Sequence, residues 1–143
     1  MGIRNLNPYI HLNGDAEPAI RLYESALGAR VEALMRYSEG PCVNPTEDQK
    51  NLILHSLLRI GDGIQLMVSD TTPDRAVQTE NGAVQICLDF SDLDSMTRAY
   101  DALSANGGNA ILPIQDSFWG AKFGILHDPF GICWMFHCAA PAN

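Results

Sequence analysis

The chain has 143 residues, of which 46% are hydrophobic and 18% are charged, and its formal net charge is −8 at pH 7. These proportions exclude a disordered chain and indicate a globular domain large enough to bury its own core. The nine Lys and Arg residues are scattered along a chain with 17 Asp and Glu residues. A nucleic-acid surface is therefore not expected, because phosphate binding needs clustered basic side chains.

The sequence predicts neither export nor membrane insertion. Residues 1–5 lack the basic and apolar regions of a signal peptide, and Pro8 interrupts any such run. No apolar stretch approaches the roughly 18 residues that a membrane span requires. A domain of this size also has no need of disulfides. We therefore expect a cytoplasmic protein with reduced thiols at its four cysteines, Cys42, Cys87, Cys133 and Cys138.

The first half of the chain predicts a strand, a helix and three further strands. Asp15 is a candidate helix cap, residues 19–27 show helical spacing of apolar side chains, and Gly28 provides a C-terminal stop. The segment 38–50 contains few apolar residues and is expected to be a loop. Residues 61–63, Gly-Asp-Gly, predict a hairpin turn. The strands are expected at residues 9–12, 31–37, 52–60 and 64–69.

The same order returns after a linker at 71–82. Residues 84–90 alternate as a strand with one apolar face, and Ser91 or Asp92 can cap a helix that stops at Gly107-Gly108. Three more strands are expected at 110–114, 123–127 and 132–137, with a turn at 128–131. In the last strand, Trp134 and Met135 should face opposite sides of the sheet.

The repeated order predicts an α+β fold in which residues 1–143 form a single domain. It contains two βαβββ modules, at about 7–70 and 83–138, joined by the linker. One helix cannot cover both faces of a four-stranded sheet, so the modules are expected to pair into a curved mixed sheet with a concave pocket. The pairing could occur within the chain or between chains.

Three blocks of sequence resemble the PhnB-like family. They are residues 8–15 with 19–23, residues 55–62 with 66–70, and residues 118–124 with 128–131 and Trp134. This family belongs to the glyoxalase/bleomycin-resistance/extradiol-dioxygenase superfamily, also called vicinal oxygen chelate, and the resemblance implies its fold and a homodimer. Many PhnB-like proteins carry a demethylubiquinone methyltransferase label. No glycine-rich nucleotide loop follows the first strand here, so methyl transfer of the Rossmann type is not expected.

The resemblance also implies where a metal ion would be held. Metal-dependent members use His and Glu, and the corresponding positions here are Pro8 or Asn7, Gln65, Gln85 and Met135. These side chains are poor ligands for Zn²⁺, Ni²⁺ or Fe²⁺, which prefer imidazole, carboxylate or thiolate. We therefore predict a metal-free small-molecule-binding protein without a cofactor. Its pocket is predicted to be lined by His55, Gln65, Gln85, Trp119 and Met135.

Among the four histidines, His55 is the candidate for chemistry, because it lies in an apolar strand where an imidazole needs a partner. It could act as a hydrogen-bond donor or as a general base, or it could be an ordinary hydrogen-bonded histidine, as we expect for His11, His127 and His137. Asp70 is expected to cap the turn that follows it. Phe118 and Trp119 could stack on a planar ligand or could simply pack over the sheet edge.

Two further classes of function stay open at this point. The chain could be a lyase, isomerase or dioxygenase that acts on a small oxygenated substrate, either with an unusual metal ion or with His55 as the base. It could also serve mainly as a dimerising partner module. The identity of the ligand does not follow from the sequence, since one fold supports many different sites.

Overall fold

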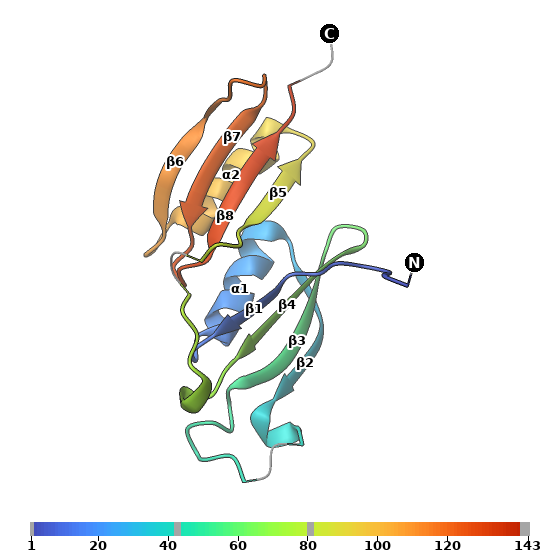
Figure 1. The fold of residues 1–143 in the computed structure, drawn as a ribbon, viewed down its shortest axis with the longest axis vertical. Helices are drawn as coiled ribbons and strands as arrows, with labels where there is room; N and C mark the ends of the chain where they lie inside the picture. The colour runs from blue at the N-terminus through green and yellow to red at the C-terminus, as the bar shows by residue number, and fades with distance from the viewer. Residues whose placement is uncertain (1, 42–43, 80–81, 141–143) are drawn as a thin grey trace. The chain divides into compact units, whose positions relative to one another are not determined.

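The computed structural model describes residues 2–41, 44–79 and 82–140 and contains two α-helices and eight strands in these ranges. The chain divides into two compact units, Met1–Val77 and Gln78–Asn143. Figure 1 shows that each unit consists of a four-stranded sheet with one helix packed against it. Cys42 lies outside the described residues.

The first unit forms a mixed sheet in the order β1-β4-β3-β2. Strands β1 and β4 are parallel, whereas β3 runs antiparallel to both β4 and β2. Its elements in chain order are β1 (Tyr9–Leu12), α1 (Ala16–Leu27), β2 (Arg30–Arg36), the 3-10 turn η1 (Tyr37–Glu39), β3 (Ile53–Ile60), β4 (Ile64–Asp70) and the 3-10 turn η2 (Pro73–Arg75).

The second unit repeats this arrangement in the order β5-β8-β7-β6, with β5 parallel to β8 and the other neighbours antiparallel. Its elements are β5 (Ile86–Phe90), α2 (Leu93–Ser104), β6 (Asn109–Asp116), β7 (Lys122–His127) and β8 (Cys133–Cys138). The predicted α+β class and the twofold strand–helix–three-strand order are therefore confirmed.

Most element boundaries agree with the sequence prediction, and the second helix shows the clearest difference. It ends at Ser104, where the hydroxyl group donates to the Tyr100 carbonyl at 2.8 Å, and Ala105 is already extended. Gly107-Gly108 was predicted to stop the helix, but Gly108 is needed for another reason: it lies against the backbone of the last turn of α2. A Cβ atom there would lie 2.6 Å from the carbonyl oxygen of Leu103, so only glycine fits.

The core of the first unit lies between its sheet and α1. Residues that alternate along β1, β3 and β4 point to the helix, because successive side chains in a strand face opposite sides. The buried residues on this side are Ile10, Leu12, Ser56, Leu58, Leu66 and Val68, and the helix contributes Ala16, Ala19, Ile20 and Tyr23. Gly28 follows α1 with a left-handed φ of 67°, as predicted for a helix stop.

The carboxylate of Asp70, at the end of β4, connects three parts of the first unit. Its Oδ1 atom accepts hydrogen bonds from the backbone N–H groups of Gly14 and Ala16, each at 2.9 Å. Its Oδ2 atom accepts from the N–H of Ile53 at 3.0 Å. The side chain is 3% exposed, so these bonds satisfy backbone donors that would otherwise be buried without partners.

These contacts correct two expectations about helix caps and turns. The Asp15 side chain makes no capping bond to α1, because Asp70 occupies that role from the neighbouring strand. Because both carboxylate oxygens of Asp70 are bonded to the N–H groups of Gly14, Ala16 and Ile53, Asp70 does not cap the turn that follows it. The prediction for the second helix is confirmed, since Asp92 accepts a hydrogen bond from the N–H of Ser95 at 2.7 Å.

The second unit has its own buried polar anchor. Asp128 is 2% exposed, and its carboxylate accepts from the indole N–H of Trp134 at 2.9 Å and from the N–H groups of Phe130 and Ile132. Trp134 is 1% exposed, whereas Met135 lies on the opposite face of β8, as its alternation with Trp134 predicted. Among the residues that the structure describes, no helix is long and apolar enough to cross a membrane.

The substitution Asp70→Ala tests the importance of this connection. It leaves three buried N–H groups without an acceptor, so we expect the free energy of unfolding to fall by about 3 kcal/mol or more. Urea denaturation followed by circular dichroism measures the change. The control Asp101→Ala removes an exposed helical carboxylate and should change stability by less than about 0.5 kcal/mol. Equal stability of the two variants would contradict this account of Asp70.

Candidate functional site

The face of the first sheet that points away from α1 carries a group of polar and aromatic side chains. In the parallel pairing of β1 and β4, His11 lies opposite Ser69 and Tyr9 lies opposite Met67. Both alternate with the buried residues of β1, so they face away from the helix. His55 lies on β3 next to the buried Ser56 and faces the same side.

Two hydrogen bonds and a ring stack hold this cluster together. Tyr9 Oη lies 2.8 Å from His55 Nδ1, and Ser69 Oγ lies 3.1 Å from His11 Nδ1. The rings of Tyr9 and His11 stack with centroids 4.4 Å apart and an interplanar angle of 9°. The expectation that His55 needs a partner in an apolar strand is met by the phenol of Tyr9.

The pair Tyr9–His55 can satisfy its hydrogen bond in either protonation state of the imidazole. When Nδ1 is unprotonated, the phenol donates to it, and when Nδ1 carries a proton, that N–H donates to the phenol oxygen. The contact is therefore compatible with either tautomer of the imidazole. Such a pair suits either a ligand hydrogen bond or acid–base chemistry.

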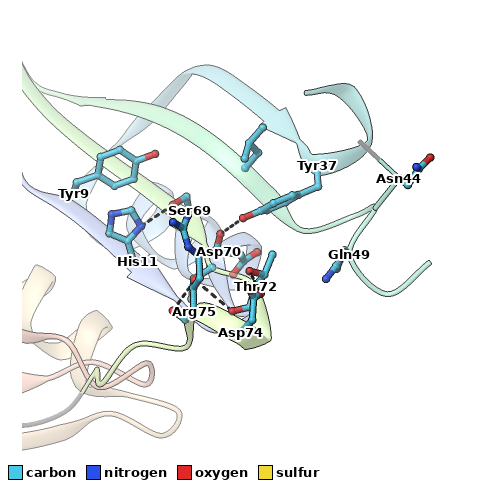
Figure 2. A pocket seen from close by; sticks show the side chains of 12 residues that line it. Tyr9, His11, Tyr37, Asn44, Gln49, Ser69, Asp70, Thr72, Asp74 and Arg75 are labelled. Atoms are coloured by element: carbon cyan, nitrogen blue, oxygen red, sulfur yellow. Dashed lines mark hydrogen bonds between the residues drawn. The ribbon is translucent and has the colours of Figure 1, made fainter. Parts of the chain in front are cut away.

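A cavity of about 730 Å³ lies beside this cluster, and Figure 2 shows the side chains that line it. Tyr9, His11 and Ser69 form one side, Tyr37, Asn44 and Gln49 lie across from them, and Thr72, Asp74 and Arg75 come from the segment around η2. Leu54, Asp70 and Thr71 complete the lining. A cavity of this size accommodates a small molecule.

The shape of the cavity depends on the buried Asp70. The hydroxyl group of Tyr37 donates to the Asp70 carbonyl oxygen at 2.8 Å, and the N–H of Thr71 donates to the Leu12 carbonyl at 2.7 Å. The Asp70 carboxylate is fully used by backbone N–H groups, so it positions the walls and is a poor candidate for an acid or a base.

The second sheet carries a different cluster on the face opposite α2. The indole N–H of Trp119 donates to His137 Nε2 at 3.3 Å, and His137 Nδ1 lies 2.8 Å from Asp89 Oδ1. Because an indole can only donate, Nε2 is the acceptor in this contact, and Nδ1 is the ring nitrogen that faces Asp89. Trp119 also packs edge-to-face against Phe123. This loop thus packs on the sheet through Trp119, while Phe118 is 97% exposed.

The predicted pocket residues divide between the two units. His55 and Gln65 lie on β3 and β4 of the first unit, and Gln65 faces Arg59 across the strand pair. Met135 lies on β8 between Cys87 and Ile125, and Trp119 precedes β7.

Gln85 precedes β5 and lines a second cavity of about 290 Å³ together with His127 and Cys133. Within the units, the structure therefore brings His55 to Tyr9, and Trp119 to His137 and Phe123. Over the ranges that the structure describes, no hydrogen bond, ion pair or ring stack joins any two of the five predicted residues inside either unit.

Sequence reasoning missed Tyr9, Ser69, Asp89 and Arg75 as components of these sites. The alternation of Tyr9 with His11 is visible in the sequence and marks two neighbouring aromatic rings on one face. The pairing of His11 with Ser69 and of Asp89 with His137 joins residues more than 45 positions apart. It depends on the register of parallel strands, which no local pattern encodes.

The positions implied for a metal ion do not fit one. Gln65 and Gln85 offer amide oxygens, Met135 offers a thioether, and Asn7 and Pro8 add no imidazole, carboxylate or thiolate. Over the described ranges 2–41, 44–79 and 82–140, no group of three or more His, Cys, Asp or Glu side chains is arranged to hold a metal ion. The donor chemistry at these positions thus differs from that of the metal-dependent enzymes.

Comparison with known proteins places the chain in a family. The family model "Glyoxalase/Bleomycin resistance protein/Dioxygenase superfamily" matches residues 6–136, and the chain belongs to this superfamily. The resemblance seen in the sequence is thereby confirmed at this level.

Several relatives match over most of their length. Protein YjdN of Escherichia coli strain K12 is 28% identical over 141 residues, which covers 92% of this chain and 93% of the relative. The crystal structure of protein PA1353 from Pseudomonas aeruginosa superposes with a TM-score of 0.84 at 30% identity, covering 97% of this chain and 100% of the other. A PhnB protein from Bacillus cereus has the same fold, with a TM-score of 0.75 at 19% identity and coverage of 95% and 100%.

The cysteines of the second unit provide a test of the electrostatics on its open face. Burial raises the pKa of both the Cys87 and the Cys133 thiols above the ordinary value, and the carboxylate of Asp89 raises the pKa of Cys87 further. Because only the thiolate reacts, Asp89→Asn should increase the alkylation rate of Cys87 at pH 8 by about two- to threefold. Peptide mass spectrometry after iodoacetamide treatment measures this, with Cys133 as the internal control. An equal increase at both cysteines would instead indicate general loosening of the sheet.

Proposed function

We propose that this chain binds a small molecule on the open face of its first sheet, without a metal ion held by the protein. The observation that supports the proposal most directly is the cluster of Tyr9, His11, His55 and Ser69 beside a cavity of about 730 Å³. A binding site needs a concave volume together with a few placed polar groups, and this face has an open cavity lined by such groups.

The chemistry of the cluster favours a ligand with a planar part and oxygen atoms. The stacked rings of Tyr9 and His11 offer an aromatic surface, and Leu54 adds an apolar wall. His55 and Tyr9 can donate or accept a hydrogen bond at the edge of that surface. Small oxygenated compounds match this combination.

The remaining predicted residues, Gln65, Gln85, Trp119 and Met135, are proposed as additional contacts. These residues belong to both units, and the sequence predicted that the two modules pair into one curved sheet. Such pairing, within one chain or in a homodimer, is part of the proposal, as is a cytoplasmic location. Trp119 is already held by His137 and Phe123, so its ring is a rigid surface for stacking.

Catalysis is the second candidate function, and the Tyr9–His55 hydrogen bond favours it. In this alternative His55 is a general base that removes a proton from a small oxygenated substrate, and the reaction is that of a lyase or an isomerase. Tyr9 acts as a positioning residue, because it keeps the imidazole bonded at Nδ1 and leaves Nε2 available to the substrate.

A ligand screen tests the binding function. Protein treated with a chelator should still be stabilised by at least one small oxygenated compound in a thermal-shift assay, because no metal ion is needed. His55→Ala and Trp119→Ala should each weaken that compound by about tenfold, as expected when one hydrogen bond or one ring contact is lost. Asp101→Ala, which changes an exposed side chain on α2 that lines neither cavity, is the control. Unchanged affinity in both test variants would discard the pocket assignment, and binding only after addition of a divalent metal would discard the metal-free proposal.

Comparison of Tyr9→Phe with His55→Gln separates binding from catalysis. If His55 is a base, His55→Gln should abolish turnover of a substrate yet leave binding within about threefold, since glutamine keeps hydrogen-bonding capacity but cannot take up a proton. Tyr9→Phe should shift the pH dependence of turnover while retaining activity. Equal losses of binding and turnover in His55→Gln would leave only the binding role.

A further inference from the structure

Among the described residues, Arg75 is the one Arg or Lys side chain that lines the larger cavity. It belongs to η2, and in Figure 2 it extends from that turn into the cavity on the side of Ser69. Its backbone is held in place, because its N–H donates to the Thr72 carbonyl at 2.8 Å and its carbonyl accepts from the Thr71 hydroxyl at 2.8 Å. The guanidinium group therefore projects from a fixed point of the chain.

The guanidinium group of Arg75 has no hydrogen bond or salt bridge to any residue that the structure describes. Five of the nine basic residues of the chain, which has 17 acidic residues, bind a carboxylate. The paired basic side chains include Arg21, Arg36, Lys50, Arg59 and Lys122, each bound to a carboxylate. The charge of Asp74 acts on the Arg75 guanidinium, but none of its N–H donors is bonded within the described residues, so they are available for a ligand.

Gln49 adds a second donor on the opposite side of the cavity. Its Oε1 atom accepts a hydrogen bond from the N–H of Thr46 at 3.1 Å, so its amide NH₂ group is the free end. In Figure 2 the nitrogen of Gln49 lies at the cavity side of the loop. The free N–H donors of Arg75 and Gln49 therefore suit a ligand group that carries several hydrogen-bond acceptors.

Asp74 limits how much negative charge the cavity can accept. Its carboxylate accepts a hydrogen bond from the Thr72 hydroxyl at 2.5 Å, and this bond lowers its pKa below the usual range, so it stays ionised at neutral pH. A ligand with two negative charges would be repelled by Asp74, whereas a single charge can be matched by Arg75. A carboxylate fits the planar guanidinium with two parallel hydrogen bonds.

We infer that the ligand of this site is a monocarboxylate whose charged group binds Arg75 while its planar part lies against the rings of Tyr9 and His11. The inference rests on the proposed binding function and adds the chemical class of the ligand. Since Arg75 is exposed, solvent screens the ion pair and its effect on affinity should be moderate.

Three probes that share a phenyl ring test the charge requirement: benzoate, the isosteric neutral benzamide and the doubly charged phenyl phosphate. Their affinities for the full chain are measured by NMR titration in a buffer free of carboxylates. We expect benzoate to bind more tightly than either of the others. Arg75→Gln should weaken benzoate by about fivefold and change benzamide by less than about twofold. Asp74→Asn, which can still accept from Thr72, should strengthen benzoate by about twofold.

The control Arg98→Gln removes a guanidinium from α2 in the other unit and should leave all three affinities unchanged. Benzamide binding as tightly as benzoate, with both weakened by His55→Ala, would overturn the carboxylate inference and leave the proposed binding function in place. Tighter binding of phenyl phosphate would also overturn it. No saturable binding of any probe would count against both.

Discussion

The burial of the Asp70 carboxylate is the constraint on which the first unit depends. The Asp70 side chain, at the end of β4, accepts hydrogen bonds from backbone N–H groups at the start of α1 and at the start of β3. The backbone carbonyl of Asp70 accepts a further hydrogen bond from the hydroxyl group of Tyr37. A buried carboxylate is tolerated only when its oxygens are bonded, so the three backbone segments cannot move apart independently. Asp70 itself lines the cavity, together with Tyr37 and with Leu54 of β3, so the same hydrogen bonds fix part of the cavity wall.

Each unit contains one buried aspartate that joins separate parts of the unit, but the two aspartates have different partners. In the first, Asp70 joins a strand to a helix start, and in the second, Asp128 joins a turn to the indole of Trp134. Their open faces differ as well, with Tyr9 and His55 on one and Trp119 and His137 on the other. A duplicated scaffold has thus acquired two unlike surfaces, which is how one fold comes to support many functions.

Membership of the superfamily accounts for the fold of this chain, whereas the side chains on its open sheet faces are its own. At the positions that hold metal ions in related enzymes stand amides and a thioether, such as Gln65 and Met135. Hydrogen-bonding groups that can exchange protons, chiefly His55 with Tyr9, are concentrated elsewhere on the same sheet. The binding function proposed for this face, and the alternative of proton transfer at His55, both draw on these side chains.

Local patterns in the sequence determined most of the fold, because strand alternation, helical spacing and the stop at Gly28 depend on neighbouring residues. They also marked His55 and Trp119 as candidates. Tertiary structure alone decided their partners, since the contacts Tyr9–His55 and Trp119–His137 join distant parts of the chain. It likewise assigned Asp70 to a helix cap that the sequence attributed to Asp15, because a cap needs an acceptor close in space and not close in sequence.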